Sequence, residues 1–276
     1  MEKFKKRCKC NVCIDSLSSF NYKGGDYFYC QRCNLYYDSS GVNVILPEGL
    51  YVEAKKIESA TKKRMQEKIL RCKYYENVTQ LYYMTHKNNM ESILNLGILS
   101  KNKVESEKII YTDCSMKEVQ DKREKLIHLN DGAYNIHETV PLYFTPKNPT
   151  YYKMQCNLPS EFCIIIVSKE IIHADVAFGF SDGNLGSSYS KDYSDLSVID
   201  KLNWDIINSN EKWSDDYQKR KRCAEFLIYP KILPNYFVKI LVDDCELKES
   251  VKQILIELNL NIPVEIDNNN KYFYKI

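Results

Sequence analysis

The sequence predicts an α+β protein of 276 residues that carries a small cysteine-rich module at its front. Three observations lead to this prediction. Short runs rich in β-branched and aromatic residues recur from residue 78 onward. They alternate irregularly with helical stretches, which argues against a doubly wound parallel sheet. Two cysteine pairs precede all of these runs.

The cysteine module is expected to cover residues 1–50 and to bind one zinc ion. Two Cys-x-x-Cys pairs are separated by sixteen residues, a spacing typical of tetrahedral zinc sites in short segments. Zinc would replace the hydrophobic core that so short a segment cannot build. The predicted ligands are Cys10, Cys13, Cys30 and Cys33.

The loop between the two pairs has its own signals. Gly24-Gly25 supplies a turn, and Tyr27-Phe28-Tyr29 predicts a short strand that leads into the second pair. Cys8 remains an alternative to Cys10 as the first ligand, although the spacing from Cys10 to Cys13 repeats that of the second pair. Such a ribbon serves as a nucleic-acid grip, a protein docking surface or a scaffold, and its basic flank favours the first role.

Residues 51–77 are expected to form a connecting helix, because apolar residues recur there at helical spacing. The remaining residues, 78–276, form the main domain. A helix is expected over 88–96 with Gly97 as its stop, and a late helix over 245–258. Strands are expected over 81–85, 140–144, 162–167, 224–229 and 237–242. The segment 178–216 reads as a long polar loop, which inside a compact domain is usually functional.

The junction at 218–228 combines a run of cations with an apolar segment. Glu225 is the carboxylate where the two meet. The cations would attract a phosphate-bearing partner, and a lone acid at the start of a buried strand is in the desolvated surroundings that tune a carboxylate for chemistry. In isolation, the same pattern is also what a strand opened by a solvated charge cluster looks like.

Bulk properties exclude several classes of protein. The formal charge of +2 is too small to predict nucleic-acid binding by itself, although Lys and Arg cluster near residues 3–9, 55–73 and 219–222. The chain has eleven cysteines, no signal-peptide pattern and no apolar run of membrane-spanning length, so we expect a reduced cytoplasmic protein. Neither a Rossmann glycine motif nor a P-loop motif occurs.

Four landmarks follow one another along the main domain. They are Tyr82-Tyr-Met-Thr-His86 with the helix after it, Pro141-Leu-Tyr-Phe-Thr-Pro146, Ser181-Asp-Gly-Asn184 with Leu202-Asn-Trp-Asp205, and Arg222-Cys-Ala-Glu-Phe-Leu-Ile228. In this order and spacing, over roughly residues 79–243, they resemble the DarT family of nucleic-acid ADP-ribosyltransferases. The cysteine module and the connecting helix lie outside the resemblance.

The resemblance implies a split core of two small β-sheets packed together, with peripheral helices and NAD in the cleft between the sheets. It implies transfer of ADP-ribose from NAD onto a base of single-stranded DNA, by a toxin of a toxin–antitoxin or phage-defence system whose partner is a macrodomain antitoxin. RNA or protein as acceptor, and a non-catalytic zinc-ribbon nucleic-acid binder, are the alternatives.

Glu225 and Arg123 are the expected catalytic residues. Nicotinamide leaves NAD as a neutral molecule without a general acid, and an oxocarbenium-like sugar remains. One carboxylate, Glu225, is then sufficient to stabilise the developing charge or to take the proton from the attacking base nitrogen. By the resemblance, Arg123 would clamp the pyrophosphate or the base, although its sequence context alone is that of an exposed helical arginine.

The remaining predicted site residues divide into two groups. The expected NAD-binding residues are Tyr83, Thr85, His86 and Asn89, where His86 is equally well explained as a structural cap and Tyr83 stands where the family often carries a histidine. The long loop is implied to face the acceptor, and its hydrogen-bonding, stacking and basic residues are expected to bind nucleic acid. These are Asp182, Asn184, Tyr189, Tyr193, Trp204, Arg220 and Arg222.

Overall fold

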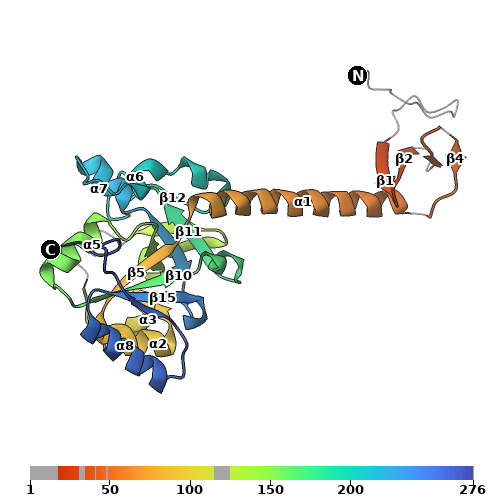
Figure 1. Ribbon diagram of the computed structural model, residues 1–276. Coiled ribbons are helices and arrows are strands. Elements are labelled where there is room, and N and C mark those ends of the chain that lie inside the picture. The colour runs from red at the N-terminus through yellow and green to blue at the C-terminus, as the bar shows by residue number, and fades with distance from the viewer. Residues whose placement is uncertain (1–17, 31–34, 41, 48, 115–124, 276) are drawn as a thin grey trace. The chain divides into compact units, whose positions relative to one another are not determined.

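The computed structural model describes residues 18–30, 35–40, 42–47, 49–114 and 125–275 (Figure 1). It divides into two compact units, Met1–Leu70 and Arg71–Ile276. Within the described residues, no helix is long and apolar enough to cross a membrane.

The first unit is built on an antiparallel sheet in the order β1-β2-β3-β4, formed by β1 (Ser18–Tyr22), β2 (Gly25–Cys30), β3 (Leu35–Tyr37) and β4 (Asn43–Val44). The predicted strand over Tyr27–Tyr29 is confirmed as part of β2. Gly24 turns the chain between β1 and β2 with a φ of 80°, a value that glycine adopts without strain.

Aromatic side chains form the small core of this sheet. Phe20 and Tyr36 are buried against Leu50 and Ala54, the first residues of α1 (Leu50–Asn77) to face the sheet. The Tyr29 ring stacks on the Tyr51 ring with 4.6 Å between centroids. The predicted helix over 51–77 is therefore present, and its first turns contribute to the core of the first unit.

The described part of the second unit contains an eight-stranded sheet in the order β12-β11-β13-β9-β5-β10-β15-β16. The strands pair antiparallel except for β15 with β16. Their bounds are β5 (Leu81–His86), β9 (Val140–Tyr143), β10 (Phe162–Val167), β11 (Ala177–Ser181), β12 (Asp192–Tyr193), β13 (Glu225–Tyr229), β15 (Phe237–Val242) and β16 (Val264–Ile266).

The expected α+β class is confirmed. The two small sheets that the resemblance implied are found instead as two halves of one eight-stranded sheet. One sheet runs through the unit, and between β5 and β9 its described strands share a single residue pair, Tyr82 opposite Tyr143. On either side of this junction the pairing is more extensive, since β5 pairs with β10 from Leu81 to His86. The sheet therefore has two halves that are joined at a narrow point.

Helices cover the sheet, and its strands are buried accordingly. All six residues of β10 are buried, and alternate residues belong to two different core clusters, which places a packed layer on each face. The α-helices of this unit include α2 (Met90–Leu96), α3 (Lys101–Ser106), α5 (Pro149–Asn157), α6 (Trp204–Asn208), α7 (Asp216–Arg222) and α8 (Cys245–Glu257).

Short elements complete the unit. The 3-10 helices are η1 (Lys87–Asn89), η3 (Ile136–Glu138), η4 (Lys169–His173), η5 (Leu196–Lys201) and η6 (Pro234–Tyr236). β6 (Ile98–Leu99) pairs with β14 (Lys231–Ile232), and β7 (Leu126–Leu129) pairs with β8 (Gly132–Asn135). The segment 178–216, expected to be a long loop, contains most of β11, all of β12, η5 and α6.

Candidate active site

A cavity of about 230 Å³ opens beside the narrow junction of the sheet. Its walls come from β5, the segment 111–114, η3 and α5, and Asn184 of the loop after β11 also contributes. The lining residues are Tyr83, Met84, Thr85, Asn89, Leu99, Lys101, Val104, Tyr111, Thr112, Asp113, Cys114, Ile136, His137, Thr139, Pro141, Tyr143, Thr150, Tyr151, Met154 and Asn184.

Glu225 lies next to this cavity. It is the first residue of β13, it is fully buried, and it stands opposite Tyr143, which lines the cavity. Burial raises the pKa of Tyr151 well above its ordinary value, and the neighbouring Tyr143 and Glu225 add to the effect. The Glu225 carboxylate is therefore within electrostatic range of Tyr151 on the cavity wall.

Three of the four residues expected to bind NAD line the cavity, namely Tyr83, Thr85 and Asn89. Burial raises the pKa of the Tyr83 hydroxyl to about 12, so this group is a neutral hydrogen-bond donor at physiological pH.

Asn89 joins two walls of the cavity. Its Nδ2 donates to Thr85 Oγ1 at 3.2 Å and to the Thr112 carbonyl at 3.0 Å, and its Oδ1 accepts from the Thr112 amide at 2.7 Å. The side chain of Asn89 therefore holds the segment 111–114 against the end of β5.

His86, the fourth residue expected to bind NAD, has the contacts of a structural cap, which was the alternative interpretation. Its Nδ1 accepts a hydrogen bond from the Asn88 amide at 3.1 Å, which caps η1, and its Nε2 lies 3.3 Å from Glu161 Oε2. Burial lowers the pKa of the imidazole, and the nearby Glu161 carboxylate opposes that shift. These contacts account for both ring nitrogens, so the placement of His86 favours the structural cap.

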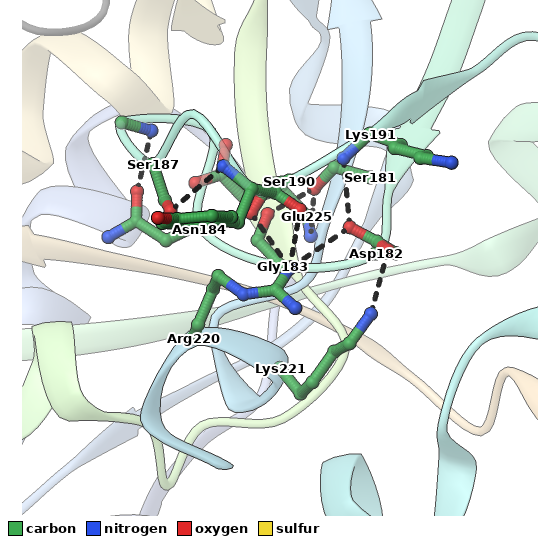
Figure 2. Close-up of polar contacts among 12 residues, drawn as sticks. Ser181, Asp182, Gly183, Asn184, Ser187, Ser190, Lys191, Arg220, Lys221 and Glu225 are labelled. Carbon is green, nitrogen blue, oxygen red and sulfur yellow. Dashed lines mark hydrogen bonds and ion pairs between the residues drawn. The ribbon is translucent and has the colours of Figure 1, made fainter. Parts of the chain in front are cut away.

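The loop from β11 to β12 lies beside Glu225 (Figure 2). The Glu225 amide donates to Ser181 Oγ at 3.1 Å, and this hydroxyl donates to the Gly183 carbonyl at 2.7 Å. Asn184 is on the cavity wall, and its Oδ1 accepts from the Gly186 amide at 2.8 Å. Tyr189 projects from the loop with 82% of its surface exposed.

Asp182 and Arg220 contact each other instead of facing outward. The Asp182 carboxylate accepts from Lys221 Nζ at 2.7 Å and from Arg220 Nη1 at 3.4 Å. Arg220 Nη1 also donates to the Tyr189 carbonyl at 3.1 Å. The cationic run is thus the last turn of α7, and two of its residues, Arg220 and Lys221, pair with Asp182 within the protein.

Three further residues that were expected to bind nucleic acid are packed into the domain. Arg222 is 3% exposed, and its guanidinium donates to the carbonyls of Ile206, Lys147 and Ser209. The Trp204 indole donates to the Ile199 carbonyl and lies edge-on to Phe144, and the Tyr193 ring stacks on Phe180. These contacts hold Arg222, Trp204 and Tyr193 against the core, and nucleic-acid binding by these three residues stays a prediction.

Several predicted residues lie outside the described part of the chain. They are Arg123, Cys10, Cys13 and Cys33. Cys30 closes β2 opposite Leu35 of β3. Within the described residues, no group of three or more His, Cys, Asp or Glu side chains is placed to hold a metal ion.

Sequence reasoning missed several residues of the cavity. Tyr143 belongs to the Pro141–Pro146 landmark, but only the pairing of β9 with β13 places it opposite Glu225. Tyr151 lies on α5, whose start carried a recognisable signal: Asn148 caps the helix by accepting from the Tyr151 amide, and Pro149 follows at the first helical position. The wall residues Thr112, Asp113 and Cys114 have no such signal.

The family model for DarT, the single-stranded DNA thymidine ADP-ribosyltransferase, matches residues 82–274. The chain belongs to the DarT family. A DNA ADP-ribosyl transferase–DNA ADP-ribosyl glycohydrolase fusion protein of Thermosipho africanus is 32% identical over 194 residues, which are 67% of this chain and 47% of the fusion protein. The chain thus matches about half the length of that relative. A DNA ADP-ribosyl transferase of Thermus sp. strain 2.9 is 25% identical over 66% of this chain and 89% of its own length.

Solved structures of DarT proteins share the fold. The Thermus sp. 2.9 DarT in complex with ADP-ribosylated single-stranded DNA has a TM-score of 0.64 at 22% identity, over 71% of this chain and 97% of that one. The Thermosipho africanus DarTG in complex with ADP-ribose has a TM-score of 0.61 at 30% identity, over 70% of this chain and 51% of that one. The matched region covers the large sheet and leaves the first unit aside.

Proposed function

We propose that this chain transfers ADP-ribose from NAD onto a thymidine base of single-stranded DNA. The observation that carries the proposal is Glu225, a fully buried carboxylate at the start of β13, beside a cavity in a fold of the DarT family. The family description names the acceptor, and a related DarT has been solved with ADP-ribosylated single-stranded DNA. No observation favours an RNA or protein acceptor.

In this proposal NAD is the substrate and binds in the cavity. The bond between the ribose C1′ and the nicotinamide nitrogen breaks, and nicotinamide leaves with the bonding electron pair. A nitrogen of the base then forms a new bond to C1′ and loses its proton. Glu225 stabilises the positive charge on the sugar as the first bond breaks, and its carboxylate accepts the proton from the base.

The other residues take supporting roles. Tyr83, Thr85 and Asn89 hold NAD at the end of β5, and Asn184 approaches from the acceptor side. Tyr189 is exposed enough to stack on a base of the acceptor strand. Arg123 remains a proposed clamp for the pyrophosphate or the base, on the strength of its sequence context. His86, Trp204 and Arg222 are left out of this set because their contacts are structural.

We also propose a toxin role and an antitoxin partner. An enzyme that marks DNA bases would harm its own cell without a means of reversal. One relative is a fusion of a DNA ADP-ribosyl transferase with a DNA ADP-ribosyl glycohydrolase, which pairs the two activities in one chain. A macrodomain glycohydrolase is the corresponding partner for this chain, in a toxin–antitoxin or phage-defence system.

Zinc binding by the first unit remains a proposal of its own. The strand pairing supports it: Ser18 at the start of β1 stands opposite Tyr29, so the chain enters β1 at the end of the sheet where β2 finishes in Cys30. Cys30 pairs with Leu35 of β3, so the Cys30-x-x-Cys33 sequence begins at this end of β2. Thiolates of Cys10 or Cys8, Cys13, Cys30 and Cys33 would hold the ion.

The decisive experiment compares wild type with Glu225→Gln. Purified protein is incubated with NAD and single-stranded oligonucleotides that contain or lack thymidine, and mass spectrometry detects the added ADP-ribose. We expect transfer to thymidine-containing DNA, and a loss of roughly a hundred- to thousandfold in rate for Glu225→Gln, since an isosteric amide cannot carry the charge.

The control variant is Glu249→Gln, an exposed carboxylate on α8 that pairs with Lys252 at 2.8 Å. It should transfer at the wild-type rate. Equal rates for Glu225→Gln and wild type, or modification of RNA or protein in place of DNA, would contradict the proposal.

A further inference from the structure

The loop after β11 is joined to α7 by a cluster of charged side chains that is largely buried from solvent (Figure 2). The Asp182 carboxylate contacts Lys221 at 2.7 Å and Arg220 at 3.4 Å, and it accepts from the Lys191 amide at 2.9 Å. The Asp182, Lys221 and Arg220 side chains are only 13%, 11% and 15% exposed. Salt and water therefore screen these attractions little.

Backbone hydrogen bonds close the same loop. The Asp182 amide donates to the Lys191 carbonyl at 3.1 Å, and the Asn184 amide donates to the Arg220 carbonyl at 3.0 Å. Asn184 is the loop residue that lines the cavity. The loop that Asp182 joins to α7 therefore contains a residue of the cavity wall.

Glu225 is attached to this loop from two sides. Its amide donates to Ser181 Oγ, the hydroxyl directly before Asp182. Arg220 and Lys221 lie in the last turn of α7. Only Cys223 and Ala224 separate the end of α7 from Glu225, the first residue of β13. The loop, the end of α7 and the catalytic carboxylate thus form one hydrogen-bonded assembly.

We infer that Asp182 is a positioning residue, which fixes the acceptor-facing loop through Lys221 and Arg220 before DNA binds. The inference deepens the proposed function and rests on it. The Asp182 carboxylate is an anion and would repel a DNA phosphate, so direct contact with the DNA backbone does not explain its place in the loop. Its contacts with Lys221 and Arg220 do. A loop that is ordered in advance spares the acceptor the entropy cost of ordering it, and so favours binding and correct alignment of the base.

A cycle of neutral variants tests the inference. Asp182→Asn, Lys221→Gln and the double variant are compared for transfer to thymidine-containing DNA, with NAD and DNA varied separately. We expect Asp182→Asn to lower kcat/KM for DNA by roughly tenfold, while the Kd for NAD changes by less than about twofold. The double variant should be no worse than the poorer single variant, because both remove the same contact.

Hydrogen exchange supplies a readout that does not depend on activity. Amides of residues 183–191 should exchange faster in Asp182→Asn than in wild type, while those of β10 keep their protection. The matched control is Glu265→Gln, which removes the Lys239–Glu265 pair of the same 2.7 Å length from the other end of the sheet. It should change neither transfer nor loop exchange.

Two results would overturn the inference. Unchanged exchange of residues 183–191 in Asp182→Asn would show that the pair does not order the loop. A parallel loss of NAD affinity and DNA transfer would show a general effect on the fold. Failure of the proposed function looks different, because wild type would then modify no DNA at all while the exchange experiment still decides the role of the pair.

Discussion

Glu225 shows how the position of a residue in the fold determines the surroundings of its side chain. It opens β13, so its amide is held by Ser181 and its side chain emerges beside Tyr143 on the neighbouring strand. The side chain has no exposed surface. In such surroundings a carboxylate interacts strongly with a charge that forms nearby, such as the positive charge that would develop on the sugar of NAD in the proposed reaction.

Gly183 provides the first prediction at this scale. A Cβ at this position would stand 2.8 Å from the Arg220 carbonyl oxygen and 3.0 Å from Ser190 Oγ. Gly183→Ala must therefore push the loop away from α7. We expect kcat/KM for DNA transfer to fall by roughly tenfold, since small misplacements of aligned groups are expensive.

Gly132→Ala is the matched control for this change. Its new methyl group would meet only Tyr134 Cε2 at 3.7 Å, which is ordinary contact. Steady-state transfer assays on both variants measure the difference. If Gly183→Ala works as fast as Gly132→Ala, the close packing of the loop on α7 has no role in the reaction.

His86 gives a prediction for pH. Burial lowers the pKa of its imidazole in the folded protein, so the unfolded chain takes up the proton more readily. The stability that neutral His86 contributes is present above the ordinary pKa of about 6.5 and is lost as the pH falls through that value toward the lower folded pKa.

The comparison variant for this prediction is His86→Asn, which keeps an acceptor for the Asn88 amide but does not titrate. We expect the gap in unfolding free energy between wild type and His86→Asn to be smaller at pH 5 than at pH 7.5, as measured by urea denaturation. A gap of equal size at both pH values would mean that the imidazole is not held neutral.

Individual side chains were the hardest part of the site to predict. Tyr83 and Thr85 belong to a strand whose pattern is clear and Asn89 follows it, and all three line the cavity, while their role in binding NAD stays a prediction. The surroundings of Arg222 were not foreseen, because a cation in a basic run gives no sign that three backbone carbonyls will surround it. A carbonyl's position depends on tertiary structure, which local composition does not encode.

At the scale of elements, Asn89 controls the wall opposite β5. Its amide group makes two hydrogen bonds to the backbone of Thr112 and one to Thr85, all in a largely buried setting. Asn89→Ala would leave the Thr112 amide and carbonyl without these partners. We expect NAD to bind roughly ten- to a hundredfold more weakly, in line with the 1–3 kcal/mol cost of an unsatisfied buried group.

The neighbouring Asn88 supplies the control. Its Nδ2 makes one long, exposed hydrogen bond to Thr112 Oγ1 at 3.4 Å, so Asn88→Ala should bind NAD as wild type does. Isothermal titration calorimetry measures both affinities. Equal affinities for the two alanine variants would show that the segment 111–114 holds its place without Asn89.

The strands were more predictable than the connections between them. The runs over 162–167 and 237–242 correspond to β10 and β15, because buried strands are dense in β-branched residues. The predicted helix 88–96 begins instead as η1 and becomes α2 only at Met90, and it stops at Gly97 as expected. β11, β12 and α6 were missed, since they are only two to five residues long and lie in a segment rich in Gly, Ser and Asp, and since α6 depends on a cap from Asn203.

The narrow junction of the sheet could not have been predicted from sequence. The pairing of β5 with β9 spans more than fifty residues of chain, and only the folded sheet brings Tyr82 opposite Tyr143. The cavity opens where these two strands diverge, and Glu225 reaches it from the next strand, β13. A sheet of this strand order therefore creates a cavity that can serve as a substrate site without the glycine-rich turn of a Rossmann fold.

At the scale of the whole molecule, two units whose described cores differ in size share one chain. The Arg71–Ile276 unit has packed layers on both faces of a large sheet. The described core of the first unit comprises a few aromatic and aliphatic side chains around Phe20 and Tyr36. So small a core cannot offset the conformational entropy of its chain, which is why we expect a metal to complete it.

Metal removal is the last prediction, and it treats the units separately. The intact protein should contain about one zinc ion per chain, and a strong chelator should unfold the β1–β4 sheet because metal binding supplies its folding free energy. The amides of β2 would lose their protection from hydrogen exchange, whereas those of β10 would keep theirs and the Kd for NAD would not change. Cys13→Ser should have the same effect as the chelator. Comparing Cys8→Ser with Cys10→Ser then identifies the first ligand, because only the variant that lacks a ligand loses the metal. Full zinc content in Cys13→Ser, or undiminished protection of β2 after chelation, would rule out the zinc ribbon and require another source of stability for this small sheet.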